Sequence, residues 1–312
     1  MSDAYQIGLN NFDTQIRAKA KSDFISFWDE QAKKLSWFQP WIKTLDWDSP
    51  FAKWFVGGKI NASYNTLDVH QADNANKPAI LWEGENGETR TVTYRELYLD
   101  VCKFANILKS LGVKKGERVT IYLPMVPELP VAMLACARIG AVHTVVFSGF
   151  SATSLRDRID DSKSKIVITA DIGFRKGKII ELKKIADEAT KDLDFIEQII
   201  VLKRAEGYLS LGPKHTLWHE LMKNSSQECK AEELDSNHPL YILYTSGTTG
   251  KPKGVLHGTG GYLTHLYSTF QWAFDIKNSD VFFCTADIGW VTGHSYVVYG
   301  PLLHGATEVM YE

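Results

Sequence analysis

The sequence is poor in cysteine, and none of its four cysteines belongs to a C-x-x-C pair: they stand far apart, at Cys102, Cys136, Cys229 and Cys284. This spacing excludes a disulfide framework and is typical of buried thiols in a reducing compartment. The sequence also lacks the apolar core of a signal peptide and any run of 18 apolar residues. These absences predict a cytoplasmic protein without a transmembrane helix.

An excess of either charge is also missing. The 35 Lys and Arg residues nearly balance the 37 Asp and Glu residues, which leaves a net charge of −2. We therefore expect neither nucleic acid nor an anionic membrane as a partner. Hydrophobic residues make up 44% and charged residues 23% of the chain, which excludes a disordered or collagen-like protein. The length of 312 residues suggests about two domains.

The histidines lack the spacing of metal ligands, so we expect no protein metal site. Those near the motifs discussed below are His257, His265, His294 and His304. The segments around Ser151 and Ser295 each lack one glycine of the G-x-S-x-G pattern, which argues against a serine hydrolase.

From residue 119 onward, short apolar runs alternate with segments of helical periodicity. Strands are expected at 119–124, 142–147, 165–170, 196–203, 240–245, 281–287 and 306–312. Helices are expected at 127–140, 151–162, 178–193, 258–273 and from near residue 293. Such alternation predicts an α/β fold whose parallel sheet is covered on both faces. Upstream, residues 78–95 predict a β-hairpin and 94–111 a helix, whereas 203–238 are expected to be irregular.

Residues 26–70 contain five of the nine tryptophans: Trp28, Trp37, Trp41, Trp47 and Trp54, with Phe51 among the accompanying phenylalanines. We expect these side chains to anchor an N-terminal segment onto a larger body. A base-stacking platform for single-stranded nucleic acid is the alternative, but the segment has no matching basic excess.

The strongest motif is YTSGTTGKPKG, residues 244–254, where an expected strand enters a loop of hydroxyl side chains, three glycines and two lysines. Glycines let backbone N–H groups approach an anion, while hydroxyl and lysine side chains can bind phosphate oxygens. The motif is not the common P-loop, because that pattern would need a second glycine at Pro252 or Val255. A flexible surface turn is the remaining structural alternative.

This motif resembles the phosphate-binding signature of the adenylate-forming superfamily, which includes acyl-CoA synthetases, adenylation domains and luciferases. The resemblance implies stacked αβαβα layers with mostly parallel sheets. It implies a division into an N-terminal extension over residues 1–77 and an AMP-binding domain over 78–312. It also implies that the phosphates of ATP are bound by Thr245, Ser246, Gly247, Thr248, Thr249, Gly250 and Lys253.

Three further stretches resemble acetyl- and propionyl-CoA synthetases: residues 51–70, residues 285–307, and residues 145–151 together with 174–178. The resemblance implies contacts with coenzyme A (CoA) by Gly149, Arg175, Lys176, Gly177, Lys178 and Thr292, and an acyl pocket at Trp290 and Val291. We expect the cations of residues 175–178 to lie at a strand-to-helix junction, where a helix N-terminus would also attract phosphate. That family often has arginine where Lys178 stands, and lysine cannot form the bidentate contact.

The resemblance therefore implies an AMP-forming acyl-CoA synthetase that uses acetate, ATP with Mg²⁺, and CoA. Propionate or 3-hydroxypropionate as the acid, a non-catalytic nucleotide- or CoA-binding module, and an adenylation or luciferase-like ligase remain alternatives. The family's adenine, Mg²⁺ and hinge motifs and its adenylation lysine lie C-terminal to these residues. We therefore expect this chain, about the first half of such an enzyme, to make no acyl-CoA by itself.

Overall fold

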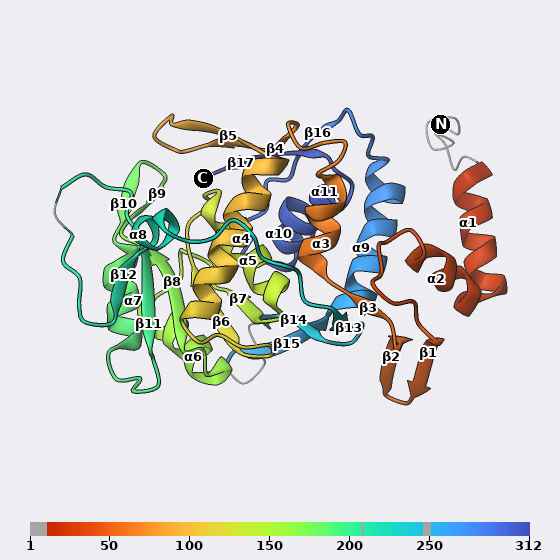
Figure 1. The fold of residues 1–312 in the computed structure, drawn as a ribbon, viewed down its shortest axis with the longest axis horizontal. Coiled ribbons are helices and arrows are strands. Elements are labelled where there is room, and N and C mark those ends of the chain that lie inside the picture. Colours follow the sequence, from red (N-terminus) through yellow and green to blue (C-terminus); the bar gives the residue numbers. More distant parts are fainter. Residues whose placement is uncertain (1–10, 208, 246–250) are drawn as a thin grey trace, which may run out of the picture.

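A computed structural model describes residues 11–207, 209–245 and 251–312, which form an α/β fold with two main sheets (Figure 1). The larger sheet has seven strands. Their spatial order is β12 (His215–Leu217), β11 (Gln198–Leu202), β8 (Ile166–Ala170), β6 (Arg118–Tyr122), β7 (Val142–Val145), β14 (Pro239–Thr245) and β15 (Lys253–Gly258). All neighbours are parallel except β14 and β15. The mostly parallel sheet predicted from the alternating pattern is confirmed.

The smaller sheet has four strands, in the order β16 (Val281–Phe283), β17 (Thr307–Tyr311), β4 (Pro78–Glu83) and β5 (Thr89–Thr93). Strands β4 and β5 form the predicted hairpin, while β17 runs parallel to both β4 and β16. Strand β16 ends at Phe283, four residues before the expected end.

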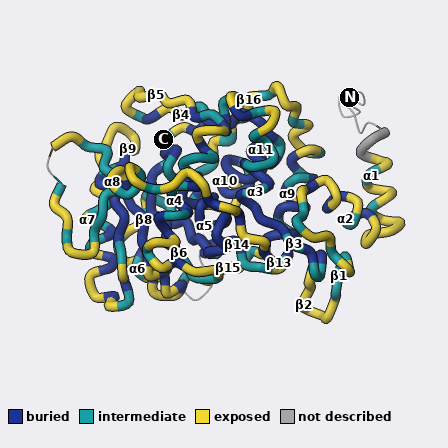
Figure 2. Tube along the Cα trace, in the orientation of Figure 1, coloured by how far each residue is buried: buried dark blue, intermediate teal, exposed yellow. Residues whose placement is uncertain are grey.

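Helices lie between and outside the sheets. Helix α5 (Glu128–Ile139) contacts β6 and β7, and α4 (Tyr94–Ser110) contacts β4 and β5; the two helices also pack against each other. Nearly every residue of α5 is buried, as expected for a helix between two layers (Figure 2). Helices α6 (Ala152–Ser162) and α7 (Leu182–Thr190) pack together, and α7 contacts β8.

Local sequence signals set the ends of the central helices. Thr93 and Glu96 form a reciprocal capping box at the start of α4. Gly140 ends α5 in the left-handed conformation, with φ of 72°, where the absence of a Cβ removes the steric penalty. These boundaries match those expected from the sequence.

Two expectations about the middle of the chain, those for residues 178–193 and 203–238, are wrong. Residues 178–180 form a strand, β10 (Lys178–Ile180), that pairs with β9 (Gly173–Arg175), so α7 begins only at Leu182. Strand β15 begins within the phosphate motif and was not among the expected strands; it lies at the edge of the sheet and precedes α9 (Thr259–Phe274), the helix expected at 258–273. The segment expected to be irregular contains β12, α8 (Trp218–Lys223) and β13 (Leu234–Asp235). The helix expected to begin near Gly293 is present, and it is composite: α10 (Val291–Gly293), the π-helix η2 (His294–Tyr299) and α11 (Gly300–Leu303).

The N-terminal segment contains α1 (Asn11–Ser22), α2 (Phe24–Ala32), β1 (Lys43–Asp48), β2 (Phe51–Val56), β3 (Lys59–Ile60), α3 (Ala62–Thr66) and η1 (Asp68–His70). Its first part, α1, α2, β1 and β2, lies at one end of the molecule, whereas α3 lies near the middle, against α5 (Figure 1). Phe27 and Trp28 anchor α2 to Trp272 of α9, with ring centroids 5.6 and 6.3 Å apart. Trp47 and Phe51 lie on the β1–β2 hairpin and are 63% and 73% exposed, so the predicted anchoring is wrong for these two.

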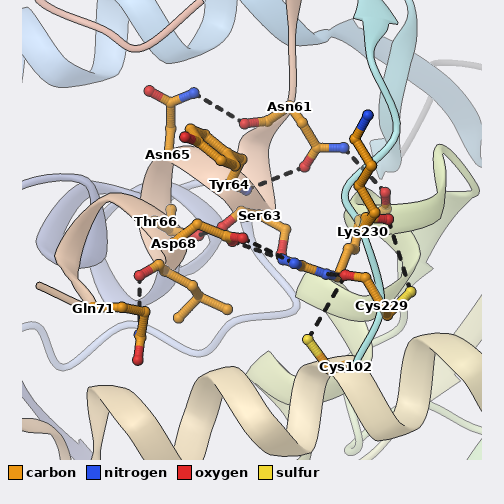
Figure 3. A network of polar contacts seen from close by, with 12 residues as sticks. Asn61, Ser63, Tyr64, Asn65, Thr66, Asp68, Gln71, Cys102, Cys229 and Lys230 are labelled. Carbon is orange, nitrogen blue, oxygen red and sulfur yellow. Dashed lines mark hydrogen bonds and ion pairs between the residues drawn. The ribbon is translucent and has the colours of Figure 1, made fainter. Parts of the chain in front are cut away.

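A buried ion pair joins the N-terminal segment to the body of the fold. Arg138, at the end of α5, is 1% exposed and forms a bidentate pair with Asp68 at 2.7 and 2.9 Å. Its Nε donates to the Cys229 carbonyl at 2.6 Å. Figure 3 shows Asn61 in the same network; its amide donates to the Ala137 and Arg138 carbonyls. These contacts satisfy carbonyls at the end of α5 that the helix itself leaves free.

Candidate functional site

A cavity of about 560 Å³ lies where the loops after several strands meet. Its walls come from the segments that follow β6, β7, β8 and β16 and from the end of β17. The volume is within the range of small-molecule sites, and open α/β sheets bind ligands at the carboxyl ends of their strands. The lining side chains used below are Phe147, Arg175, Lys176, Asp287, Trp290 and Glu312.

Gly149 makes room for a cation at this cavity. The Arg175 guanidinium lies 4.6 Å from the centre of the Phe147 ring, a cation–π contact. A Cβ added at Gly149 would lie 2.6 Å from Phe147 Cε1 and 2.7 Å from Arg175 Nη1. Any side chain at position 149 would therefore displace one of these groups. The structure brings together Gly149 and Arg175, two residues predicted to bind CoA.

The basic residues lie on a β-hairpin, which corrects the expected strand-to-helix junction. Lys176 and Gly177 form its two-residue turn, with φ of 51° and 71°; positive φ at both positions is typical of a type I′ turn. Arg175 and Lys178 are paired across the two strands, and Lys178 is exposed. Cations on adjacent strands, rather than a helix dipole, therefore supply the positive charge.

Two carboxylates hold this hairpin in place. The Gly177 N–H donates to Glu85 in the β4–β5 turn. The Phe174 N–H donates to Glu312 Oε1 at 3.1 Å, and Glu312 forms a bidentate ion pair with Arg204 at 2.5 and 2.7 Å. The hairpin is thus fixed at its turn and at its base. Neither carboxylate could be predicted from local sequence, because each acts on residues more than ninety positions away.

Trp290 forms part of the cavity wall, and its ring centroid lies 5.9 Å from Phe147 and 6.0 Å from Phe150. Trp290 and Val291 are each 48% exposed, and Thr292 is also exposed. Val291 and Thr292 follow Trp290 on α10 and do not line this cavity. Of the expected acyl-site residues, the structure therefore places Trp290 beside the predicted CoA site.

Asp287 is a cavity residue that the sequence analysis did not select. Burial raises the pKa of its carboxyl, while the Gly289 N–H at 2.7 Å and the charge of Arg175 oppose the rise. Asp287 follows a short strand, and a polar side chain at a strand end was the signal that could have identified it. It adds one hydrogen-bonding group to a wall otherwise rich in aromatic rings.

Strands β14 and β15 form the two sides of the phosphate motif. Thr245 ends β14 and is paired with Lys253 at the start of β15. Ser246, Gly247, Thr248, Thr249 and Gly250 lie outside the described residues. Because β14 and β7 are parallel, Thr245 is at the same sheet edge as the segment that contains Phe147 and Gly149.

A second contact connects this sheet edge to the cavity. The Tyr244 hydroxyl donates to Asp161 Oδ2 at 2.7 Å. The Arg158 guanidinium lies 5.6 Å from the Tyr244 ring centre and 4.6 Å from that of Phe150. Helix α6 therefore links the end of β14 to the loop that lines the cavity.

Among residues 11–207, 209–245 and 251–312, no cluster of three or more His, Cys, Asp or Glu side chains is arranged to hold a metal ion. No helix in these ranges is both long and apolar enough to cross a membrane.

Comparison with known proteins agrees with this architecture. Residues 67–312 match the family of AMP-binding enzymes, and residues 14–66 match the N-terminal region of acetyl-coenzyme A synthetases. An acetyl-coenzyme A synthetase from Rubrobacter xylanophilus is 58% identical over 303 residues, which cover 96% of this chain and 47% of the relative. The corresponding protein of Chlorobaculum tepidum is 51% identical over 301 residues, or 96% of this chain and 46% of the relative.

A solved structure of an acetoacetyl-CoA synthetase from Streptomyces lividans superposes with a TM-score of 0.88 at 29% sequence identity, covering 97% of this chain and 46% of that one. The chain thus spans about half the length of the curated relatives it matches. The matched family covers most of the residues, and the fold agrees with it. The chain therefore belongs to the AMP-binding enzyme family.

Proposed function

We propose that the chain is part of an AMP-forming acyl-CoA synthetase that acts on acetate. The observation that carries the proposal is the arrangement of Gly149, Phe147 and Arg175 at a cavity whose wall also contains Trp290. A cation over an aromatic ring can bind the phosphorylated end of CoA. The names of the relatives support acetate as the acid.

The reaction would have two steps. In the first, a carboxylate oxygen of acetate attacks the α-phosphorus of ATP, and diphosphate leaves as acetyl-adenylate forms. In the second, the CoA thiolate attacks the acetyl carbonyl, and AMP leaves as acetyl-CoA forms. Neither step needs a protein nucleophile, so the residues bind and orient the reactants and neutralise charge.

Within this scheme, the residues flanking the phosphate motif, Thr245 and Lys253, would bind phosphate oxygens of ATP together with residues 246–250. Mg²⁺ would enter with ATP, because this ion keeps several waters and commonly binds substrate phosphates. Trp290 and Val291 would limit the length of the acid, and Thr292 would lie near CoA. A pocket closed by an indole ring excludes long chains sterically but separates acids one methylene apart by only about 1–3 kcal/mol.

The fold supports a proposed division into an N-terminal extension, residues 1–77, and an AMP-binding domain, residues 78–312. The β4–β5 hairpin that starts at Pro78 belongs to one of the main sheets. We also propose a cytoplasmic location, which agrees with the buried, unpaired cysteines Cys102, Cys136 and Cys229.

The test is to supply the native gene product that contains these residues with Mg·ATP, CoA and a series of short carboxylates. AMP and acetyl-CoA in equal amounts, with rates that fall as the acid lengthens, are expected. ADP in place of AMP would refute the adenylate route, and a preference for propionate or 3-hydroxypropionate would correct the substrate. The 312-residue chain alone is expected to bind CoA without making acyl-CoA, and its turnover would refute that expectation.

A further inference from the structure

A second cavity, of about 500 Å³, lies between the N-terminal segment and the main body. We call it the interface pocket. One side is formed by Phe24, Trp28, Trp54 and Phe55 of the N-terminal segment, and the other by Leu256, His257, Tyr262 and His265 of β15 and α9. It shares no lining residue with the cavity that contains Arg175. The interface pocket is therefore a separate place where a small molecule could bind.

Aromatic rings dominate one wall of this pocket. The Trp54 ring centroid lies 5.8 Å from that of Phe24, at 64°, and 6.4 Å from that of Trp28, at 73°. Rings in such edge-to-face contact pack against one another and form a continuous apolar wall. Leu256 is 57% exposed and Phe24 50% exposed, so this apolar surface is open to solvent. A flat apolar molecule that covers it would remove this surface from water.

The lining contains no formal charge. None of its described residues is Asp, Glu, Lys or Arg, and burial lowers the pKa of His257, which keeps that imidazole neutral at pH 7. A charged ligand would lose its hydration here without a counter-charge. The pocket therefore favours an uncharged molecule.

The Ser236 hydroxyl is buried against Gly260, behind the surface of the pocket. Ser236 is 1% exposed, and its Oγ has no hydrogen-bond partner. The side chain of its neighbour Asn237 is fully engaged, because it donates to the Trp54 carbonyl at 3.1 Å and accepts from the Trp54 N–H at 3.0 Å. Neither side chain therefore offers a free polar group to a ligand in the pocket.

Backbone strain is stored in the same wall. Phe55 has φ of 54°, in the left-handed region that a bulky side chain rarely adopts. Its ring is held between Trp37 and Trp41, with centroids 5.5 and 5.0 Å away. Strained residues of this kind persist where the surrounding structure fixes them, and they cluster at ligand-binding sites.

From these observations we propose that the interface pocket binds an uncharged, planar ring system. The pocket volume fits a molecule of that size. Strand β15 carries Leu256 and His257 in the pocket wall and Lys253 at its other end, beside the phosphate motif. A bound ring would therefore rest on the strand that leaves the proposed ATP site.

The test compares 2-naphthol, which is neutral at pH 7, with 2-naphthoate, which has the same ring but a negative charge. Isothermal titration calorimetry on the 312-residue chain should give one site for 2-naphthol and at least tenfold weaker binding of 2-naphthoate. Equal affinity for the two probes, or no binding of 2-naphthol, would overturn the proposal.

Two variants locate the site. A Cβ at Gly261 would lie 3.6 Å from Trp54 Cδ1, an ordinary contact, so Gly261→Leu should fill the pocket and abolish binding. Leu256→Asp, at an exposed position, should weaken 2-naphthol binding at least tenfold. Val281→Asp, at a position that is 59% exposed and outside the pocket, is the matched control and should bind as the unchanged chain does. Circular dichroism shows whether each variant is folded. If Gly261→Leu does not fold, the binding of 2-naphthol by Leu256→Asp decides whether the interface pocket is the site. Unchanged binding by a folded pocket variant, or equal loss in the control, would refute the location.

Discussion

Replacing Gly149 by alanine should weaken the binding of CoA, because the new methyl group would collide with the cation beside it. The added Cβ would lie 2.7 Å from Arg175 Nη1 and 2.6 Å from Phe147 Cε1, and real Cβ atoms do not approach other atoms this closely. The Phe147 ring is part of the cavity wall, whereas the guanidinium is the end of a flexible side chain. We therefore expect Arg175 to move away from its position over the ring.

The magnitude follows from the contact that would be lost. A hydrogen bond to a charged group contributes about 1.5–3 kcal/mol. At about 1.4 kcal/mol per factor of ten, the loss corresponds to roughly 10- to 150-fold weaker binding. Since the effect acts through one guanidinium, Gly149→Ala should change CoA affinity much less in a chain that already carries Arg175→Ala.

The assay is calorimetric titration of the 312-residue chain with CoA and with CoA that lacks its 3′-phosphate. Gly258→Ala is the matched control, because a Cβ there would lie 3.7 Å from its nearest neighbour, the Asn237 carbonyl oxygen. Circular dichroism confirms that each variant folds. If Gly149→Ala binds CoA as the unchanged chain does, or if the two substitutions have additive effects, the proposed role of Gly149 is refuted.

Three further predictions concern stability. Asp68→Asn should lower the free energy of unfolding in urea by about 3–5 kcal/mol, since it leaves a buried guanidinium without its counter-charge. The control Glu233→Gln breaks an exposed ion pair and should lower it by less than about 1 kcal/mol. Equal effects of the two substitutions would refute the distinction between the buried and the exposed pair. Burial lowers the pKa of His304 to about 4 from an ordinary value of 6.5. The neutral form therefore stabilises the fold above pH 6.5, and this contribution is lost as the pH falls toward 4. In urea unfolding, His304→Gln should flatten the dependence of the unfolding free energy on pH in this range, and exposed His219→Gln should not. Burial raises the pKa of Glu308 to about 10, so the contribution of its neutral carboxyl to stability is complete below pH 4.5 and declines from there to pH 10. Glu308→Gln should therefore stabilise the fold by on the order of 3 kcal/mol at pH 7, measured by urea unfolding. Unchanged stability of this variant at pH 7 and 9 would contradict the reasoning.

The central strands and helices were predictable because their signals are local. Strands β6, β7, β8 and β11 are short, mainly apolar runs. Gly112 follows the helix that precedes β6, and Gly140 follows the helix that precedes β7. Each of these signals is contained in a stretch of about a dozen consecutive residues, so it can be recognised without knowing the tertiary structure. These elements establish the mostly parallel sheet and the sheet edge at which the cavity lies.

The hairpin that carries Arg175 was not predictable in the same way. Its turn is Lys176-Gly177, whereas the usual sequence signal for this turn is Asn-Gly or Asp-Gly. The basic residues were therefore assigned to the start of a helix. The partners that hold the hairpin are Glu85, in the β4–β5 turn, and Glu312, directly after β17, and both are distant from the hairpin in the sequence. The predicted set of residues was a useful guide to the cavity, but its supporting contacts depend on tertiary structure.

The contacts of Asn61 and Asp68 also limit how this protein can be divided. A chain that started at Pro78 would retain both main sheets but would lose the counter-charge of Arg138 and the amide that caps the end of α5. The proposed N-terminal extension, residues 1–77, which contains Asn61 and Asp68, is therefore not an exchangeable module. Any rearrangement that joined residues 78–312 to a different N-terminal partner would have to replace a buried charge pair and a set of helix-end hydrogen bonds at the same time.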